Sequence, residues 1–228
     1  MTRKLWVTVL SRQLSGGRAI LGPSHVFREG IYMKRSAIIT LGLLAMGIIS
    51  FQPVSGVAGQ AGGWTALFDG SNLNNFNPIG NANWEIVDGT AGADSGSGFL
   101  VTKESYDDFE LTLEFWVDEP ANSGIFIRCA DPSSVNDRNS YEVNIYDTRA
   151  DQTYRTGGIV HIAAPNSVIM TGGKWNSYAI KAQGSRLMVT LNGEEMVDVE
   201  DSQFANGPIA LQYGAGIVKF RNVQIRPL

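Results

Sequence analysis

A row of polar side chains on one predicted strand is the first place in this sequence where chemistry could occur. Residues 140–147 alternate between apolar and polar side chains. Because successive side chains of a strand point to opposite faces, Glu142, Asn144 and Tyr146 share one face. Asp147 follows where the strand ends. A carboxylate, an amide and a phenol in one row could bind the hydroxyl groups of a sugar, and a solvated outer face is the plain alternative.

A second predicted strand just upstream could complete this surface. In residues 122–129, Phe126 and Arg128 share one parity, and the apolar residues between and around them share the other. If the two strands are neighbours in a sheet, Phe126 and Arg128 join the polar row that contains Glu142. A surface ion pair between Arg128 and Glu142, of little energetic value, is the alternative reading of that arginine.

The N-terminal part of the chain has the order of a secretory signal peptide. A short basic segment, Met33-Lys34-Arg35, precedes an uncharged apolar run over residues 37–51, and small residues follow. The run is short for a membrane span, which needs about 20 residues. We expect residues 33–59 to be a signal peptide and residues 1–32 a misassigned extension, with a long n-region or a tilted anchor as alternatives. The protein is then exported, to the periplasm or the extracellular space, and keeps no stable membrane association after cleavage.

Residues 60–228 form one acidic domain, since no linker, repeat or low-complexity tract divides them. They carry 11 Lys and Arg against 21 Asp and Glu, a net charge of −10. Nucleic-acid binding relies on clustered basic residues, so this balance favours a neutral substrate or a bound cation instead. One cysteine, Cys129, excludes an internal disulfide and has the parity of a buried apolar residue. One histidine, His161, excludes a His-rich zinc site.

Short alternating segments predict an all-β domain without a convincing helix. Residues 109–117 alternate strictly, and Asn192-Gly193 between two apolar runs predicts a β-hairpin with a type I′ turn. Residues 90–98 are rich in Gly and Ser, so we expect a loop there, and we assign Trp64 and Trp175 to the core. About a dozen strands at this spacing predict a sandwich or barrel. The predicted strands are residues 64–68, 84–87, 99–102, 109–117, 122–129, 140–147, 158–162, 175–182, 187–191, 194–199, 209–213 and 218–225.

Taken in order, these segments resemble the bacterial 3-keto-disaccharide hydrolase domain (DUF1080). The motifs that carry the resemblance are residues 64–70 (WTALFDG), 108–111 (DFEL), 122–128 (NSGIFIR), 141–145 (YEVNI), 175–178 (WNSY), 192–193 (NG), 207–212 (GPIALQ) and 220–225 (FRNVQI). The resemblance implies a concanavalin-like jelly-roll sandwich of two antiparallel sheets. It also implies a secreted enzyme that acts on glycosides whose C3 hydroxyl is oxidised to a ketone. Phe76, His161 and Tyr213 depart from the residues usual in the family.

The chemistry implied by a 3-keto glycoside needs one base rather than the two carboxylates of ordinary glycoside hydrolysis. The ketone acidifies the C2 proton, so a base can form an enolate that expels the C1 oxygen, and water then adds. We expect Glu142 or His161 to be the base, with Tyr146 as a proton donor. Arg128 is expected to stabilise the enolate and, by its charge, to keep the pKa of Glu142 low.

The remaining candidate residues are assigned to substrate or cation binding. The expected substrate contacts are Asn144, Phe126, Asp147, Arg155 and Gln212. Glu142 and Asp147 are also candidate ligands of a divalent cation, although no cofactor is required by the sequence. A non-catalytic, lectin-like carbohydrate-binding module is the alternative function, because the same fold serves both roles. An interaction domain of an envelope complex is a third hypothesis.

Overall fold

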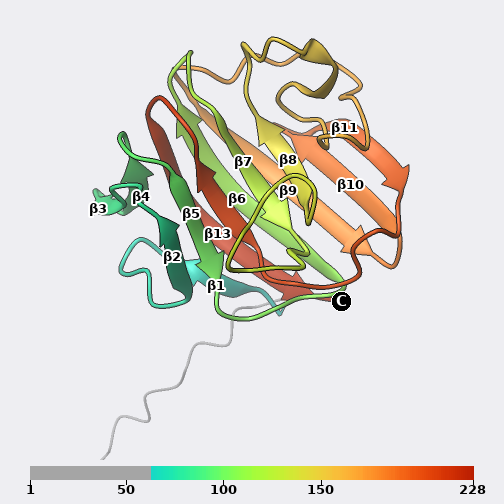
Figure 1. The fold of residues 1–228 in the computed structure, drawn as a ribbon, viewed down its shortest axis with the longest axis horizontal. Helices are drawn as coiled ribbons and strands as arrows, with labels where there is room; N and C mark the ends of the chain where they lie inside the picture. The colour runs from blue at the N-terminus through green and yellow to red at the C-terminus, as the bar shows by residue number, and fades with distance from the viewer. Residues whose placement is uncertain (1–62) are drawn as a thin grey trace, which may run out of the picture. The chain divides into compact units, whose positions relative to one another are not determined.

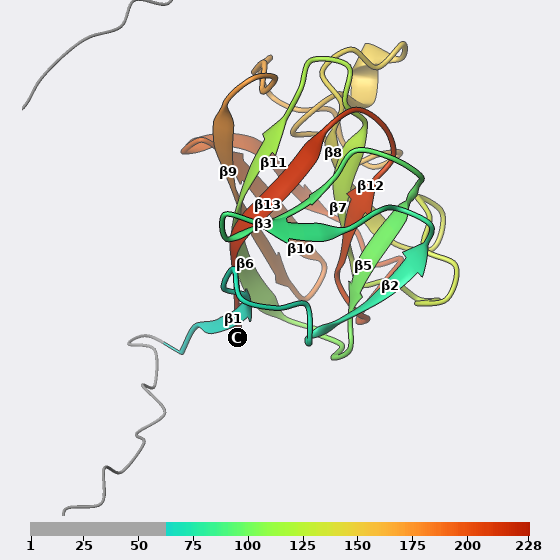
Figure 2. The same cartoon turned by 90° about the vertical axis from the view of Figure 1, so that its left-hand side faces the viewer.

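The computed structural model describes residues 63–228 and places them in two packed antiparallel sheets (Figure 1; Figure 2). The predicted signal peptide, residues 33–59, and the predicted extension before it lie outside the described residues. Within the described part, the helical structure is a single 3₁₀ turn, Gln152–Tyr154. No helix between residues 63 and 228 has the length and hydropathy that a membrane crossing requires. The prediction of an all-β sandwich is therefore confirmed.

The larger sheet has eight strands, in the order β11-β10-β9-β6-β13-β4-β3, and β1 also pairs with β13. The strands are β1 (Thr65–Phe68), β3 (Glu85–Val87), β4 (Thr90–Ala93), β6 (Phe109–Val117), β9 (Trp175–Gln183), β10 (Arg186–Leu191), β11 (Glu194–Glu200) and β13 (Val218–Pro227). At the β10–β11 turn, Asn192 and Gly193 have φ angles of 52° and 84°. Both values are left-handed, as a type I′ turn requires, so the predicted hairpin is confirmed.

The smaller sheet has five strands in the order β2-β5-β12-β7-β8 and lies in front of the larger one in Figure 1. Its strands are β2 (Phe76–Gly80), β5 (Gly98–Thr102), β7 (Ser123–Ile127), β8 (Tyr141–Ile145) and β12 (Ala210–Tyr213). In Figure 2 the two sheets are seen side by side, with β2, β5 and β7 in one layer and β6 and β9 in the other. The functional candidates of the sequence fall on this smaller sheet and its loops.

The core lies between the two sheets and is built by the alternation that the sequence shows. In β6, Phe109, Leu111 and Phe115 are each 0 % exposed and Leu113 is also buried, while the alternate residues of the strand are half-buried on the outer face. In β8, Val143 is 0 % and Ile145 is 1 % exposed, as expected for the core parity. Burying this apolar surface supplies most of the stabilisation of a sandwich.

Two strands, β2 and β4, were not predicted, and each has a local reason. β4 falls in the predicted loop of residues 90–98, because its inward residues, Ala91 and Ala93, are too small to give a clear apolar signal. β2 contains Pro78, which a central strand would exclude, but β2 is an edge strand, where proline is tolerated. The predicted strand at residues 158–162 is instead a looser segment with isolated bridges.

The placement of Trp64 and Trp175 in the core is wrong. Both side chains are half-buried on the outer face of the eight-stranded sheet. The Arg226 guanidinium lies 5.0 Å from the Trp64 ring, and the Arg221 guanidinium lies 3.9 Å from the Trp175 ring. Each indole is therefore covered by a cation rather than by core side chains.

The free edge of β8 is covered by the loop that follows it in the chain. The Asn144 amide donates to the Gly158 carbonyl (3.0 Å), and the Gly157 amide donates back to the Asn144 carbonyl (3.1 Å). The Val160 amide donates to the Glu142 carbonyl at 3.0 Å. The strand that carries Glu142 is thus an edge strand of the sheet, and this loop pairs three of its outer backbone groups.

Candidate functional site

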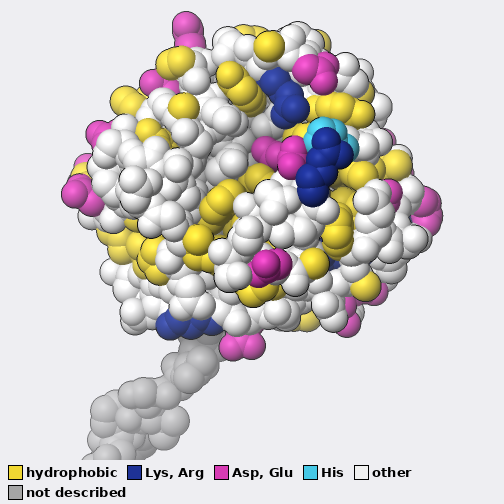
Figure 3. All heavy atoms as spheres, viewed as in Figure 1, with side chains coloured by type: hydrophobic (Ala, Val, Ile, Leu, Met, Phe, Trp, Pro, Cys, Tyr) yellow, Lys and Arg dark blue, Asp and Glu magenta, His cyan; other side chains and the backbone are white. Residues whose placement is uncertain are grey.

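A pocket of about 400 Å³ lies on the outer face of the five-stranded sheet. Four of the predicted site residues line it: Phe126, Glu142, Tyr146 and Gln212. Figure 3 shows this face, where acidic, basic and histidine side chains gather around a hollow. These four side chains therefore lie together in one pocket, as their strand parity predicts.

The pairing of β7 with β8 builds the floor of the pocket. Phe126 lies directly opposite Glu142, so the two side chains share one face. The Phe99 ring meets the Phe126 ring edge to face, with centroids 5.2 Å apart. Gly124 leaves room for the carboxylate, since a Cβ there would lie 3.2 Å from Glu142 Oε1. The floor is thus an apolar aromatic surface with one carboxylate set into it.

The pKa of the Glu142 carboxyl group is raised by its surroundings. The residue is 7 % exposed, and this burial, with the nearby negative charge of Asp137, raises the pKa of Glu142 to about 7. The positive charge of Arg149 opposes the rise. Among residues 63–228, no basic side chain forms an ion pair with Glu142 within 4.0 Å. The expectation of a low pKa is therefore wrong, and near neutral pH this group can both accept and release a proton.

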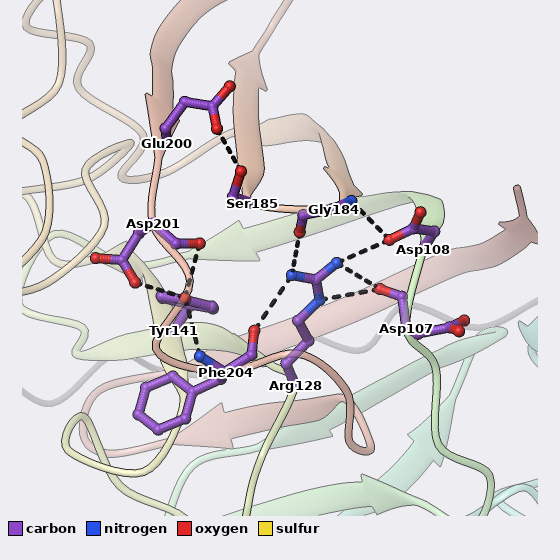
Figure 4. Close-up of polar contacts among 9 residues, drawn as sticks. All are labelled: Asp107, Asp108, Arg128, Tyr141, Gly184, Ser185, Glu200, Asp201 and Phe204. Carbon is purple, nitrogen blue, oxygen red and sulfur yellow. Dashed lines mark hydrogen bonds and ion pairs between the residues drawn. The ribbon is translucent and has the colours of Figure 1, made fainter.

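Arg128 does not lie beside Glu142, and that prediction is wrong. Its side chain is 1 % exposed and binds backbone carbonyls of surrounding loops (Figure 4). It donates to the carbonyls of Asp107 (2.9 and 2.7 Å), Gly184 (2.8 Å) and Phe204 (3.2 Å), and to Asp108 Oδ1 (3.1 Å). All three guanidinium nitrogens donate hydrogen bonds, so Arg128 holds loops together. It does not line the pocket.

The backbone at Arg128 explains the error. Arg128 has a φ of 54°, in the left-handed region that few residues other than glycine adopt. Alternation of faces stops at such a residue, so Cys129 packs in the outer cluster with Phe126 and not in the main core. Cys129 is buried as predicted, and burial raises the pKa of its thiol to about 12. A thiol in this state is an unreactive packing group at neutral pH.

Asp147 organises a loop and is not available to bind a cation with Glu142. Its Oδ1 accepts from the hydroxyls of Thr156 (2.6 Å) and Thr171 (3.0 Å). Its Oδ2 accepts from the amides of Thr171 (2.6 Å) and Gly172 (3.1 Å). These four donors satisfy the carboxylate. Across the described residues no group of three or more His, Cys, Asp or Glu side chains is placed to hold a metal ion.

Asn144 and Arg155 were predicted to contact substrate, and both lie outside the pocket. Asn144 is 0 % exposed, and its side-chain amide donates to the Tyr154 carbonyl beneath the loop. Arg155 is 9 % exposed and donates to Gln152 Oε1 (2.8 Å) and to the Asp147 carbonyl (3.2 Å). The loop after β8 folds back over this end of the strand, which is why the polar row is only partly open.

His161 lies at the margin of the pocket. Its Nε2 is 2.8 Å from Asp137 Oδ2, and its ring meets the Tyr154 ring at a centroid distance of 5.8 Å. His161 has a φ of 66°, in the left-handed region, where histidine, asparagine and aspartate occur more often than other residues with a side chain. Asp137 lines the pocket, so His161 is connected to the site by its contact with the Asp137 carboxylate.

Two charged residues of the pocket were not predicted: Asp137 and Arg149. Asp137 comes from the polar loop before β8, and Arg149 from the loop after it. Asn122 and Asn136 also line the pocket and add neutral hydrogen-bonding groups. Strand periodicity says nothing about loops, so the only signal was that both loops flank the strand of Glu142. Arg149 supplies the positive charge that was assigned to Arg128.

A comparison with protein families decides what kind of domain carries this pocket. A family model described as a 3-keto-alpha-glucoside-1,2-lyase-like domain matches residues 63–226. The chain belongs to this family. The match covers the whole described sandwich apart from its last two residues, so the resemblance seen in the sequence is confirmed. A comparison with curated proteins found no match.

Solved structures with the same fold include proteins related to carbohydrates. A proposed glycosyl hydrolase from Parabacteroides distasonis ATCC 8503 is 28 % identical, covers 72 % of this chain and 99 % of its own, and has a TM-score of 0.61. A second one from the same organism is 18 % identical, covers 73 % and 94 %, and has a TM-score of 0.66. The carbohydrate-binding module CBM66 from Bacillus subtilis is 19 % identical, covers 66 % and 94 %, and has a TM-score of 0.52. The last two likenesses show the fold alone.

Proposed function

We propose that the protein is an exported enzyme that cleaves the glycosidic bond of 3-keto-glycosides. The observation that carries the proposal is Glu142, a carboxylate in an aromatic-floored pocket whose pKa is raised to about 7. A general base is most effective when its pKa lies near the working pH. Membership of a 3-keto-glucoside lyase-like family and the likeness to a proposed glycosyl hydrolase support the choice of substrate.

The reaction needs one proton transfer to begin. Glu142 takes the C2 proton, which the adjacent C3 ketone acidifies, and the electrons form an enolate. The enolate then reforms the ketone as the C1–O bond breaks, and the leaving oxygen takes a proton. Water adds across the resulting C1–C2 double bond, with its hydroxyl at C1 and its proton at C2, which gives net hydrolysis. The elimination requires the carboxylate to accept a proton, and the hydration requires the carboxylic acid to return one. A pKa near 7 allows both transfers.

Arg149 is the group best placed to stabilise the enolate. It lines the same pocket, and its charge already acts on Glu142. A cation aimed at a developing oxyanion in a partly dehydrated site stabilises the transition state more than the ground state. Arg149 therefore takes the role that was predicted for Arg128.

The remaining pocket residues suit a sugar ring. Half-buried Phe99, with the buried Phe126 ring against it, forms an apolar floor, and Gln212 Oε1 is buried without a hydrogen-bond partner from the described residues. A buried acceptor without a donor is costly, so a substrate hydroxyl donating to Gln212 would remove this cost. Tyr146, or Asp137 together with His161, then provides the proton for the leaving oxygen.

The test uses a 3-keto-glycoside and its unoxidised parent with the purified protein. We expect turnover of the 3-keto substrate only, and we expect Glu142→Gln to abolish it while the circular dichroism spectrum stays native. Glu194→Gln, on the exposed β10–β11 hairpin, is the matched control and should retain full activity. Full activity of Glu142→Gln would contradict the proposal, and binding of sugar without turnover would favour the lectin-like alternative.

A second candidate function rests on Asp137. Asp137 and Glu142 are two carboxyl groups lining one pocket, and ordinary glycoside hydrolysis uses such a pair in different protonation states. The polar row of the strand contains only one acid, because Asp137 lies in the loop before it. Turnover of the unoxidised parent, lost in both Asp137→Asn and Glu142→Gln, would establish this reaction in place of β-elimination.

A further inference from the structure

One side chain is missing from the floor of the pocket beneath Glu142. Gly124 of β7 lies two residues before Phe126, so the two share the outer face of the five-stranded sheet. A Cβ added at Gly124 would lie 3.2 Å from both Cγ and Oε1 of Glu142 and 3.3 Å from Cε2 of Phe126. Normal contacts between carbon atoms are about 3.5–4.0 Å long. The Glu142 carboxylate therefore lies over the space that any side chain at position 124 would fill.

The backbone at position 124 does not itself require glycine. Gly124 lies inside the regular ladder of β7, opposite Asn144 of β8, and it is not one of the glycines with a positive φ. A glycine in the interior of a strand lowers stability and often marks the close approach of another group. At position 124 the approaching group is the side chain of Glu142. The lost stability is thus associated with one particular placement of the carboxylate.

Packing sets how deeply the Glu142 carboxylate lies in the pocket. Within residues 63–228 no hydrogen bond or ion pair reaches its oxygens. The charged or titratable groups that line the pocket with it come from the end of β8 and the loops beside it: Asp137, Tyr146 and Arg149. The other strands of the sheet contribute neutral side chains, those of Phe99, Phe126 and Gln212. Asp137 and Arg149 act on the carboxylate through their charges, whereas contact with the floor fixes its depth.

The depth of the carboxylate decides two properties of a base. Burial is the main reason that the pKa of Glu142 is raised, so a carboxylate lifted off the floor toward the pocket mouth meets more water and has a lower pKa. The same displacement moves the oxygen that must reach the C2 proton. A misplacement of about 1 Å in an active site can cost about 10²-fold in rate. The few tenths of an ångström that an added Cβ demands should therefore cost about 3–10-fold.

We propose that Gly124 is a positioning residue for the reaction: with no side chain there, the Glu142 carboxylate lies against the sheet at the depth from which it reaches the substrate. The inference rests on the proposed role of Glu142 as the base. Gly124 itself is buried and has no group that could exchange a proton. Any side chain at position 124 would lift the carboxylate, so efficient proton transfer requires glycine at this position.

Gly124→Ala adds the smallest side chain and tests the proposal by kinetics on a 3-keto-glycoside. The three atoms nearest the added Cβ belong to side chains, so the variant should fold with a native circular dichroism spectrum. We expect kcat to fall about 3–10-fold and KM to change less than about 2-fold, because the base acts in the transition state. Gly92→Ala is the matched control and should keep wild-type kinetics. Gly92 also lies within a strand, β4, without a positive φ, and its added Cβ would meet the Val218 carbonyl oxygen at an ordinary 3.4 Å.

Carbon-13 NMR titration of the glutamate carboxyl groups tests the placement without any substrate. The Glu142 signal is the one absent from Glu142→Gln, and it should titrate at about pH 7 in the wild type. In Gly124→Ala we expect the pKa of Glu142 to be lower by about half a pH unit or more. Gly124→Ser should lower it further, because a serine hydroxyl at this position can donate a hydrogen bond to the carboxylate. Gly92→Ala should leave it unchanged.

The two measurements separate this inference from the proposed function. A wild type without turnover, in which Gly124→Ala still lowers the pKa of Glu142, would contradict the proposed reaction and support the placement of the carboxylate by Gly124. Turnover by the wild type, with kcat and the pKa of Glu142 both unchanged in Gly124→Ala, would overturn the inference and leave the proposed function intact. A fall in kcat with an unchanged pKa in both variants would also overturn it, since the carboxylate would not have moved. A Gly124→Ala protein that does not fold would do the same, because the carboxylate would not be the group that gives way.

Discussion

Replacing Glu142 with glutamine should make the protein more stable at neutral and alkaline pH. The pKa of Glu142 is about 7 in the folded protein and about 4.3 in an unfolded chain. Between these values the folded state binds more protons than the unfolded state, so the free energy of unfolding falls as pH rises. Ionised Glu142 therefore opposes folding above pH 7, and this effect vanishes below about pH 4.3.

The size of the effect follows from the same two pKa values. Each pH unit between them corresponds to about 1.4 kcal/mol, which gives a total of about 3.7 kcal/mol. Glutamine keeps the shape of the side chain and cannot ionise. We therefore expect Glu142→Gln to be about 3.5 kcal/mol more stable than the wild type at pH 8 and nearly equal to it at pH 4.5.

Urea unfolding at half-unit steps from pH 4.5 to pH 8.5 measures this difference. Other titrating groups act in both proteins, so the difference between the two curves isolates Glu142. Glu194→Gln, on an exposed turn, should track the wild type throughout. A difference that stays constant with pH would refute the reasoning, because it would mean that Glu142 is not desolvated. A wild type that gains stability above pH 7 would show that attraction to Arg149 outweighs burial.

Four further substitutions test other parts of the structure. Val143→Asp would bury an unpaired charge at a position that is 0 % exposed, and a native circular dichroism spectrum would contradict the assigned faces of β8. Arg128→Met should cost about 3–5 kcal/mol in urea unfolding, and a loss of kcat without this cost would return Arg128 to the site. Asp147→Asn should cost about 1–3 kcal/mol and speed amide exchange around Thr171, and unchanged exchange would contradict its structural role. Arg149→Gln should lower kcat/KM for a 3-keto-glycoside by about 10²–10³, whereas unchanged kinetics would remove Arg149 from the reaction.

The parts of the fold with strict alternation could be predicted from the sequence. The nine residues of β6 and the Asn192-Gly193 turn are each specified by local pattern, so tertiary contacts had nothing to override. The same parity rule placed Phe126 and Glu142 in one pocket. The outward position of Trp175 could have been predicted, because Trp175 has the same strand parity as the exposed residues Ser177 and Ala179.

The rest of the site depends on features that periodicity does not contain. A left-handed φ at Arg128 ends the alternation, and a sequence gives no warning of it when the residue is not glycine. Asp137 and Arg149 reach the pocket through the paths of two loops, which only long-range packing determines. Asn144 has the right parity but lies under a loop, so a correct face did not mean an open one.

The covered edge of β8 has a consequence for how the protein behaves when it is crowded or partly unfolded. An uncovered edge strand presents free backbone donors and acceptors on which another chain can add a strand and begin a fibril. Here the amide and carbonyl of Asn144 and the carbonyl of Glu142 are occupied by residues 157–160 of the same chain. Opening of that short segment would therefore expose an edge at which other chains could add strands, on the strand that carries the proposed base. The need to avoid aggregation thus limits how far this loop can open.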